Sequence, residues 1–272
     1  MAERIRSIDS LRGRVGQDTV VVLPLGAHEQ HGPHLPYDTD TTIAEGVTSR
    51  LLSVLGNAPV FALPAEPIGY SCEHMDWPGT KTLTYRDAVE RWCALGARAA
   101  ALGVRRVLLL NAHGGNSPVM ALVAQELRVR TNVLCVATSW TRFGHPAGIV
   151  GVEEKAFGIH GGDIETSVML ALAPERVDMD AAATHPNLQR DLSERFEHLR
   201  AYGPHAFGWK MQDLSPSGVA GNAGAASAEK GEALLAEAAK GLAALVGEMQ
   251  RFDLALLRPA SCISQAHKET LP

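Results

Sequence analysis

Short apolar runs and helix-like stretches alternate along this chain. The apolar runs predict buried strands over residues 19–25, 59–63, 106–110 and 133–137. The stretches after the first three runs predict helices over residues 41–55, 84–102 and 117–130. Strands separated by amphipathic helices favour right-handed crossover connections. The pattern therefore predicts an α/β protein in which helices flank a mostly parallel sheet.

The clearest helical pattern covers residues 84–102. Its apolar positions recur at steps of four and three, at Ala88, Trp92, Leu95, Ala99 and Leu102. Thr84 can cap its first turn and Gly103 can end it. A second helical pattern follows the Ala/Gly-rich stretch 219–228, with an apolar face formed by Leu234, Leu235, Ala238, Leu242, Leu245, Val246 and Met249. Because no repeat or linker interrupts these elements, residues 1–272 are expected to form a single domain.

The composition is that of an ordinary globular protein, since 46% of the 272 residues are hydrophobic and 20% are charged. A formal charge of -5 without a basic cluster argues against nucleic-acid binding. Residues 1–13 lack the apolar core of a signal peptide, and no apolar run is long enough to span a membrane. The four cysteines show no C-x-x-C pair, which favours reduced thiols in a cytoplasmic protein: Cys72, Cys93, Cys135 and Cys262.

Five potential metal ligands crowd the stretch after the first predicted strand. They lie within twelve residues, at Glu29, His31, His34, Asp38 and Asp40. Glycines and prolines between them keep the stretch irregular. In open α/β folds, ligands bind beyond the carboxyl ends of strands, where this stretch is expected. The simpler interpretation is a polar turn in which Asp40 caps the next helix, but a turn rarely needs three histidines.

Two further turns contain a histidine among glycines. The first, N-A-H-G-G-N over residues 111–116, follows the third predicted strand, and its His113 has little apolar surface to pack against. Alternatively, the glycines serve only a tight turn with His113 hydrogen-bonded inside it. The second, H-G-G-D-I-E-T-S over residues 160–167, opens a predicted helix. Asp163 suits the positive end of that helix dipole, whereas Glu165 is the better candidate for a metal.

The candidate ligands outnumber those of a single catalytic zinc, which usually keeps about three protein ligands. They are Glu29, His31, Asp40, His113 and Glu165. Shared between two divalent ions, with Asp40 as the bridge, they leave each ion three protein ligands and room for water. Two ions about 3.5–4 Å apart lower the pKa of a bridging water and polarise a carbonyl. Mixed imidazole and carboxylate ligands suit zinc, manganese and iron(II) equally.

These motifs, in this order, resemble the creatininase family of creatinine amidohydrolase-like metalloenzymes. The resemblance rests on E-x-H-G-x-H-L-P with an aspartate nine residues after the first histidine, then N-A-H-G-G-N, then H-G-G-D-I-E-T-S. It implies one α/β domain with a binuclear metal centre, assembled as a homo-hexamer. The family's metal ligands match Glu29, His31, Asp40 and His113. His160 matches a catalytic histidine beside the metals, and Glu165 matches the acidic residue of the E-T-S motif.

One departure from the family pattern limits the expected substrate. In creatininases proper, a Tyr-Glu pair stands where this chain has Gly114-Gly115, and that glutamate is a metal ligand. Gly115 has no side chain to coordinate a metal, so the missing carboxylate is assigned to Glu165. Relatives with the H-G-G-N form include formamide hydrolases and the mycofactocin maturation peptidase, which carries a histidine in place of Asp163 and fits less well. The resemblance implies hydrolysis of a carbon–nitrogen amide bond, of the cyclic-amide or formamide type, in a small molecule.

The expected mechanism begins when a hydroxide bridging the two metals attacks the amide carbon, while one metal stabilises the oxyanion. His160 then protonates the leaving nitrogen, a role that a near-neutral pKa suits, or else it only orients a ligand. The candidate substrate-binding residues are His34, His74, Trp77, Gly114 and Gly115. Trp77, on a loop resembling the family's E-H-x-x-F-P-G-T motif, either stacks on a flat substrate or contacts another subunit. The alternatives are creatinine amidohydrolase proper, a mycofactocin-type peptidase, or a non-catalytic metal-binding regulatory protein.

Overall fold

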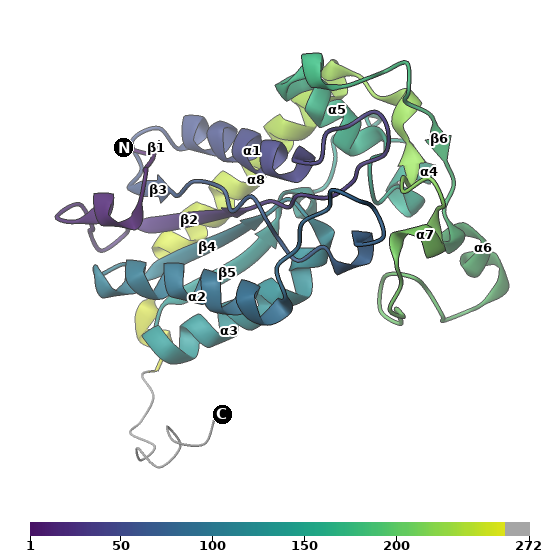
Figure 1. Cartoon of the computed structure of the whole chain (residues 1–272). Helices are drawn as coiled ribbons and strands as arrows, with labels where there is room; N and C mark the ends of the chain where they lie inside the picture. Colours follow the sequence, from purple (N-terminus) through teal and green to yellow (C-terminus); the bar gives the residue numbers. More distant parts are fainter. Residues whose placement is uncertain (259–272) are drawn as a thin grey trace, which may run out of the picture.

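The computed structural model of the chain describes residues 1–258, with a parallel five-stranded sheet at its centre (Figure 1). The strand order is β1-β3-β2-β4-β5. The strands are β1 (Glu3–Arg4), β2 (Val20–Leu25), β3 (Val60–Ala62), β4 (Arg106–Asn111) and β5 (Leu134–Ser139). The predicted α/β class is therefore confirmed, and four of the strands coincide with the four predicted apolar runs. Cys262 lies outside the described residues.

Helices cover both faces of this sheet (Figure 1). One face carries α1 (Thr39–Leu55), α5 (Asp163–Leu172) and α8 (Ala228–Arg251), and the other carries α2 (Tyr85–Ala101) and α3 (Ser117–Thr131). Successive side chains of a strand point to opposite faces, so Val20 and Val22 join the first helical layer while Val21 and Leu23 join the second. Two apolar cores thus sandwich the sheet and hold its carboxyl edge rigid.

The bounds of α2 follow from the residues at its two ends. The Thr84 hydroxyl accepts a hydrogen bond from the backbone N–H of Asp87, which caps the first turn. Gly103 follows the last turn with a φ of 98°, a conformation that residues with a side chain rarely adopt. Between these ends, Trp92 is completely buried against the sheet. The capping residues predicted for this helix are therefore confirmed.

The strand order places a topological switch point between β2 and β4. From β2 the chain passes through α1 to β3 on one side, and then through α2 to β4 on the other side of β2. The two strands are in register, with Leu25 opposite Asn111, so both end at the same edge of the sheet. The loops that leave them diverge there and open a crevice, which is where open α/β sheets bind ligands.

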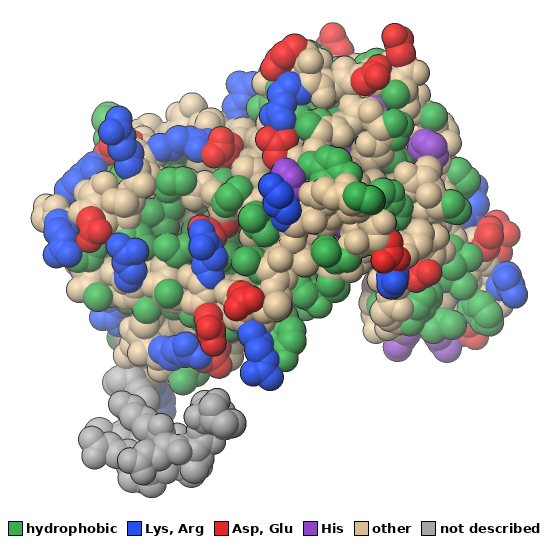
Figure 2. All heavy atoms as spheres, in the orientation of Figure 1, with side chains coloured by type: hydrophobic (Ala, Val, Ile, Leu, Met, Phe, Trp, Pro, Cys, Tyr) green, Lys and Arg blue, Asp and Glu red, His purple; other side chains and the backbone are tan. Residues whose placement is uncertain are grey.

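Residues 184–222 form a lobe beside this edge of the sheet (Figure 1). It contains β6 (Thr184–His185), α6 (Leu188–Arg195), α7 (Met211–Leu214) and β7 (Gly221–Asn222), and α4 (Val152–Phe157) lies next to it. The lobe has its own small core, which includes Leu192, Met211 and Leu214. Figure 2 shows a hollow between the lobe and the body of the molecule. No hydrophobic pattern in the sequence predicted the lobe.

Short 3₁₀ turns complete the described chain. They cover residues 8–11, 72–74, 114–116, 140–143, 174–176, 223–225 and 254–256. Two of them, 72–74 and 114–116, carry site residues considered below. Within residues 1–258, no helix combines the length and the apolar character that a membrane crossing requires.

Candidate metal centre

Four segments of the chain meet at the switch point and bring the five predicted ligands together. Glu29 and His31 lie on the loop after β2, and His113 directly follows β4. Asp40 and Glu165 lie in the first turns of α1 and α5. Except for Glu165, which is partly exposed, these side chains are almost completely buried. Their proximity agrees with the predicted ligand set, although their role as ligands stays a prediction.

One detail of that prediction is wrong, because Asp40 does not cap α1. The N-cap residue is Asp38, whose side chain makes no capping hydrogen bond and contacts Arg176 instead. Asp40 lies within the first helical turn, and its side chain is only 1% exposed. The helix start therefore points the Asp40 carboxylate into the site.

Asp40 contacts two different imidazoles through its two oxygens. His31 Nδ1 lies 3.1 Å from the carbonyl oxygen of Glu29, which can only accept, so Nδ1 carries the proton. The lone pair of His31 Nε2 then faces Asp40 Oδ1 at 3.4 Å and Glu165 Oε2 at 3.9 Å. A lone pair directed at two carboxylate oxygens is repelled unless a proton or a metal cation lies between them.

His113 repeats this arrangement on the other side of Asp40. Its Nε2 donates to the carbonyl oxygen of Tyr70 at 2.9 Å, which leaves Nδ1 as the free nitrogen. Nδ1 lies 3.1 Å from Glu29 Oε1 and 3.5 Å from Asp40 Oδ2. A backbone carbonyl thus holds the outer nitrogen of each histidine, as in many metal sites, and the inner nitrogen faces the carboxylates.

Several inward-facing atoms have no hydrogen-bond partner within the described residues. They are both carboxylate oxygens of Glu29, Nε2 of His31 and Oδ2 of Asp40. Buried carboxylates without a partner are costly, and a bound cation removes that cost. By pairwise distance, Asp40 lies between His31, which also faces Glu165, and His113, which also faces Glu29. Imidazoles and carboxylates grouped in this way fit two divalent ions.

The carboxylates favour positive charge on both of these imidazoles. Burial opposes the charged form of His31, but Asp40, Glu165 and Glu29 outweigh it and raise its pKa to about 10. Burial likewise opposes charge on His113, yet Glu29, Asp40 and Glu73 raise its pKa well above the usual value. The metal-free protein therefore holds protons at the two nitrogens where ions would bind.

His160 presents one nitrogen to the same cluster. Its Nε2 donates to the carbonyl oxygen of Gln30 at 2.6 Å, and its Nδ1 lies 3.6 Å from Glu29 Oε1. The Gln30 amide donates to the Gly218 carbonyl oxygen at 2.7 Å and to His74 Nδ1 at 3.0 Å. His74 therefore carries its proton on Nε2, 3.4 Å from Glu29 Oε1. Gln30, unnoticed between two ligand-type residues in the sequence, positions both histidines.

The near-neutral pKa expected for His160 is wrong. Burial, reinforced by His31 and His74, lowers its pKa well below the usual value. Burial is the largest of these causes, and it remains when the neighbouring imidazoles are neutral. His160 is therefore neutral near pH 7, so its Nδ1 accepts a proton before it can donate one.

A cavity of about 330 Å³ opens from this cluster towards the lobe. Of the residues proposed to bind substrate, His74, Gly114 and Gly115 line it. His34 lies behind it, where Nε2 is 3.0 Å from both the Gly161 carbonyl oxygen and Thr166 Oγ1. Trp77 packs against the core of the lobe instead. Sequence patterns missed the apolar wall on the lobe side, which is formed by Ile159, Tyr202, Trp209 and Met211.

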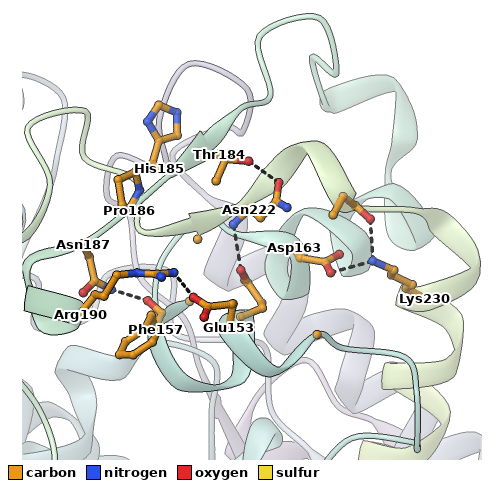
Figure 3. A pocket seen from close by; sticks show the side chains of 15 residues that line it. Glu153, Phe157, Asp163, Thr184, His185, Pro186, Asn187, Arg190, Asn222 and Lys230 are labelled. Atoms are coloured by element: carbon orange, nitrogen blue, oxygen red, sulfur yellow. Dashed lines mark hydrogen bonds and ion pairs between the residues drawn. The ribbon is translucent and has the colours of Figure 1, made fainter. Parts of the chain in front are cut away.

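A second cavity, of about 370 Å³, lies between α4, β6 and the start of α8 (Figure 3). Its charged side chains satisfy one another. Lys230 pairs with Asp163 at 2.7 Å, Arg190 pairs with Glu153, and Glu154 accepts from the backbone N–H of Asn222 at 2.8 Å (Figure 3). Because these groups already have partners, the smaller cavity beside Glu29 is the candidate functional site. The pairing also supports a structural role for Asp163.

Comparison with known proteins identifies relatives along most of the chain. The family model described as creatininase, creatinine amidohydrolase, matches residues 7–246. The mycofactocin precursor peptide peptidase of Mycolicibacterium smegmatis is 32% identical over 228 residues, which cover 82% of this chain and 83% of the relative. The creatinine amidohydrolase of Pseudomonas putida is 29% identical over 247 residues, 85% of this chain and 90% of the relative. The 3-dehydro-scyllo-inosose hydrolase of Thermotoga maritima is 27% identical over 283 residues, which cover 97% of this chain and 89% of the relative.

Solved structures of creatininases share this fold. A manganese form of creatininase superposes with a TM-score of 0.69 at 27% identity, covering 86% of this chain and 92% of its own. A zinc–zinc form of a creatininase variant gives a TM-score of 0.68 at 28% identity, with the same coverage. The family model extends through all the segments that carry the cluster. This chain belongs to the creatininase family and is a hydrolase of that family.

Proposed function

We propose that this protein is a metal-dependent amidohydrolase that cleaves a carbon–nitrogen bond in a small cyclic amide or formamide. Two divalent ions (zinc, manganese or iron) would be held by Glu29, His31, Asp40, His113 and Glu165. Bound there, they would supply an activated water and polarise the scissile carbonyl. Hydrolases of the family act on more than one kind of substrate, so the bond type is part of the proposal.

A single observation carries the metal part of this proposal. His31 and His113 each have one nitrogen fixed by a backbone carbonyl and the other directed at a buried carboxylate. The Asp40 carboxylate lies between them, with one oxygen near each. Neither oxygen of Glu29 makes a hydrogen bond within the described residues, although three imidazoles face Oε1, and buried carboxylates are normally hydrogen-bonded.

His160 is the proposed proton carrier. The Gln30 carbonyl holds its Nε2–H, so only Nδ1 faces the reacting groups. A neutral His160 would take a proton from the attacking water on Nδ1 and return it to the leaving nitrogen from the same atom. This sequence differs from simple acid catalysis, because the imidazole begins as a base and becomes the acid only afterwards.

The cavity supports a small and partly flat substrate. Its volume of about 330 Å³ is near the lower end of small-molecule sites, and Trp209 and Tyr202 form part of one wall. The indole of Trp209 is fixed by a hydrogen bond from Nε1 to the Ala201 carbonyl oxygen at 2.7 Å. A planar amide placed between this wall and Gly114-Gly115 would have its carbonyl carbon beside the carboxylate cluster.

The test combines metal analysis with a substrate screen. The purified protein, loaded separately with zinc, manganese and iron(II), is assayed for hydrolysis of creatinine, other cyclic amides, formamides and short peptides. We expect about two bound ions per chain and turnover of at least one cyclic amide or formamide. Absence of bound metal, or metal binding without hydrolysis of any amide, would contradict the proposal. The second of these results would favour a non-catalytic metal-binding protein.

A peptide-processing activity is the second candidate. It is favoured by the 32% identity to a mycofactocin precursor peptide peptidase. Release of a terminal fragment from short peptides, with no turnover of small amides, would select this candidate over the first.

A further inference from the structure

The H-G-G-N turn of residues 113–116 has no carboxylate side chain. The space that a side chain on Gly115 would occupy is filled by Glu73. A Cβ atom built on Gly115 would lie 2.5 Å from Glu73 Oε1, 2.5 Å from His113 Nε2 and 2.5 Å from the carbonyl oxygen of Tyr70. These distances are far below van der Waals contact. Glu73 and any side chain at position 115 therefore compete for one volume.

The segment that carries Glu73 is fastened to this turn. The backbone N–H of Tyr70 donates to Asn116 Oδ1 at 2.9 Å, and the Tyr70 carbonyl accepts from His113. Gly69 allows the close approach, because a Cβ there would lie 2.4 Å from the same Asn116 oxygen. The loop thus holds the 3₁₀ turn of residues 72–74 against Gly115, and this fixed backbone delivers the Glu73 carboxylate to the site.

Glu73 reaches the candidate metal cluster. One oxygen each of Glu73 and Glu29 and one nitrogen of His113 lie within 4.8 Å of one another. The Glu73 side chain is 11% exposed and lines the same cavity as Glu29. Its only ion-pair contact within residues 1–258 is the outer nitrogen of His113, Nε2, at 3.7 Å. Burial, opposed by His113 and reinforced by Glu29, raises the pKa of the Glu73 carboxyl, so a cation bound beside it would stabilise its charged form.

We propose that Glu73 supplies, from a different segment, the metal-binding carboxylate that Gly115 cannot provide. Glu73 acts on the ion shared with Glu29 and His113, whereas Glu165 acts on the ion shared with His31 and Asp40. The charges support this division, because Glu29, Glu73, Asp40 and Glu165 together balance two divalent ions. The earlier assignment of the missing carboxylate to Glu165 alone is thereby replaced. This inference rests on the metal-dependent function proposed above.

The experiment measures ion affinity and not activity. Metal-free wild type, Glu73→Gln and Glu165→Gln are titrated with Co²⁺, and calorimetry and visible absorption report each binding step. We expect two sites in the wild type. Glu73→Gln should keep one and weaken the other by about 10–100-fold, the effect typical of removing a supporting carboxylate, or more if Glu73 binds directly. Glu165→Gln should weaken the opposite site, so the double variant loses both.

Asp76→Asn is the matched control. Asp76 lies on the same loop and also loses one negative charge, but it is exposed and pairs with Lys210 at 2.9 Å. It should bind both ions as the wild type does. Glu73→Asp keeps the charge with a shorter reach and should give intermediate affinity, which provides a second test if Glu73→Gln does not fold.

Two results would overturn the inference, and they are distinguishable. Two ions bound as tightly by Glu73→Gln as by the wild type would refute the role of Glu73 and leave the metal centre intact. A wild type that binds no Co²⁺ would refute the metal-dependent function itself, and the inference with it.

Discussion

Without bound metal, the stability of this protein should fall as the pH rises. In the metal-free chain, carboxylates hold a proton on His31 by raising its pKa from 6.5 to about 10. A group whose pKa is raised by folding contributes stability that is fully present below the unfolded pKa. That contribution is lost as the pH rises towards the folded pKa. For His31 the loss therefore runs from about pH 6.5 to pH 10.

The magnitude follows from the number of protons held only by the folded state. Each such proton changes the free energy of unfolding by about 1.4 kcal/mol per pH unit. Between pH 7.5 and pH 9, His31 alone should cost roughly 2 kcal/mol, and His113, whose pKa is also raised, adds to this loss in the same direction. Since whole domains are stable by about 5–15 kcal/mol, this loss is easily measured.

The assay is urea unfolding of chelator-treated and metal-loaded protein at several pH values in this range. Bound ions take the place of the protons, so the loaded protein should lack this slope. Cysteines titrate in the chelator-treated and in the metal-loaded protein alike, so subtracting one curve of stability against pH from the other removes their contribution. In metal-free His31→Gln, the free energy of unfolding should fall less steeply with pH, by about 1.4 kcal/mol per pH unit, because one fewer proton is held by the folded state. A metal-free stability that stays constant or rises from pH 7.5 to pH 9 would refute the reasoning.

Four other outcomes are expected. Asp40→Asn should bind neither ion tightly, because it removes the carboxylate charge that lies between His31 and His113. One ion retained in mass spectrometry would contradict the proposal that Asp40 bridges two ions. His160→Ala should keep its metals and lose about 10²–10⁴-fold in turnover, whereas loss of metal would make His160 a ligand. Creatinine should be a poor substrate, and steady-state turnover near the ~10⁴ M⁻¹s⁻¹ of an efficient enzyme would overturn that expectation. Gly115→Ala should destabilise the fold by about 1–3 kcal/mol, measured by urea unfolding, because the new Cβ meets the Tyr70 carbonyl; an unchanged stability would show that the turn can move.

The elements of the sandwich were predictable because their signals are local. Each of the four apolar runs predicted as strands became one, and Thr84 and Gly103 marked the ends of α2 as expected. The lobe was not predictable in this way. Its helices are short, and its core depends on residues distant in sequence, such as Trp77 packing near Met211. Short strands such as β1 and β6 are likewise stabilised by their partners and not by a pattern of their own.

The candidate site was predictable as a set of residues but not as an arrangement. Motif spacing indicated that Glu29, His31 and His113 belong together, since strand ends bring such loops to one edge. Which oxygen faces which nitrogen depends on backbone carbonyls, such as that of Tyr70, that no motif encodes. The position of Glu73 depends on a contact between segments about forty residues apart. The sequence therefore indicated which residues could bind metal more clearly than how their atoms are arranged.

The division of the cavity between the sheet edge and the lobe has an evolutionary consequence. The inward-facing carboxylates and imidazoles come from loops and helix starts at the sheet edge, whereas Tyr202, Trp209 and Met211 come from the lobe. Residues of the lobe can therefore diverge without disturbing the reactive groups. The curated relatives include a peptidase, an amidohydrolase and an inosose hydrolase, and we expect their substrate preferences to differ through residues of the lobe. For engineering, exchange of residues 196–214 between relatives is the most economical route to a new substrate preference.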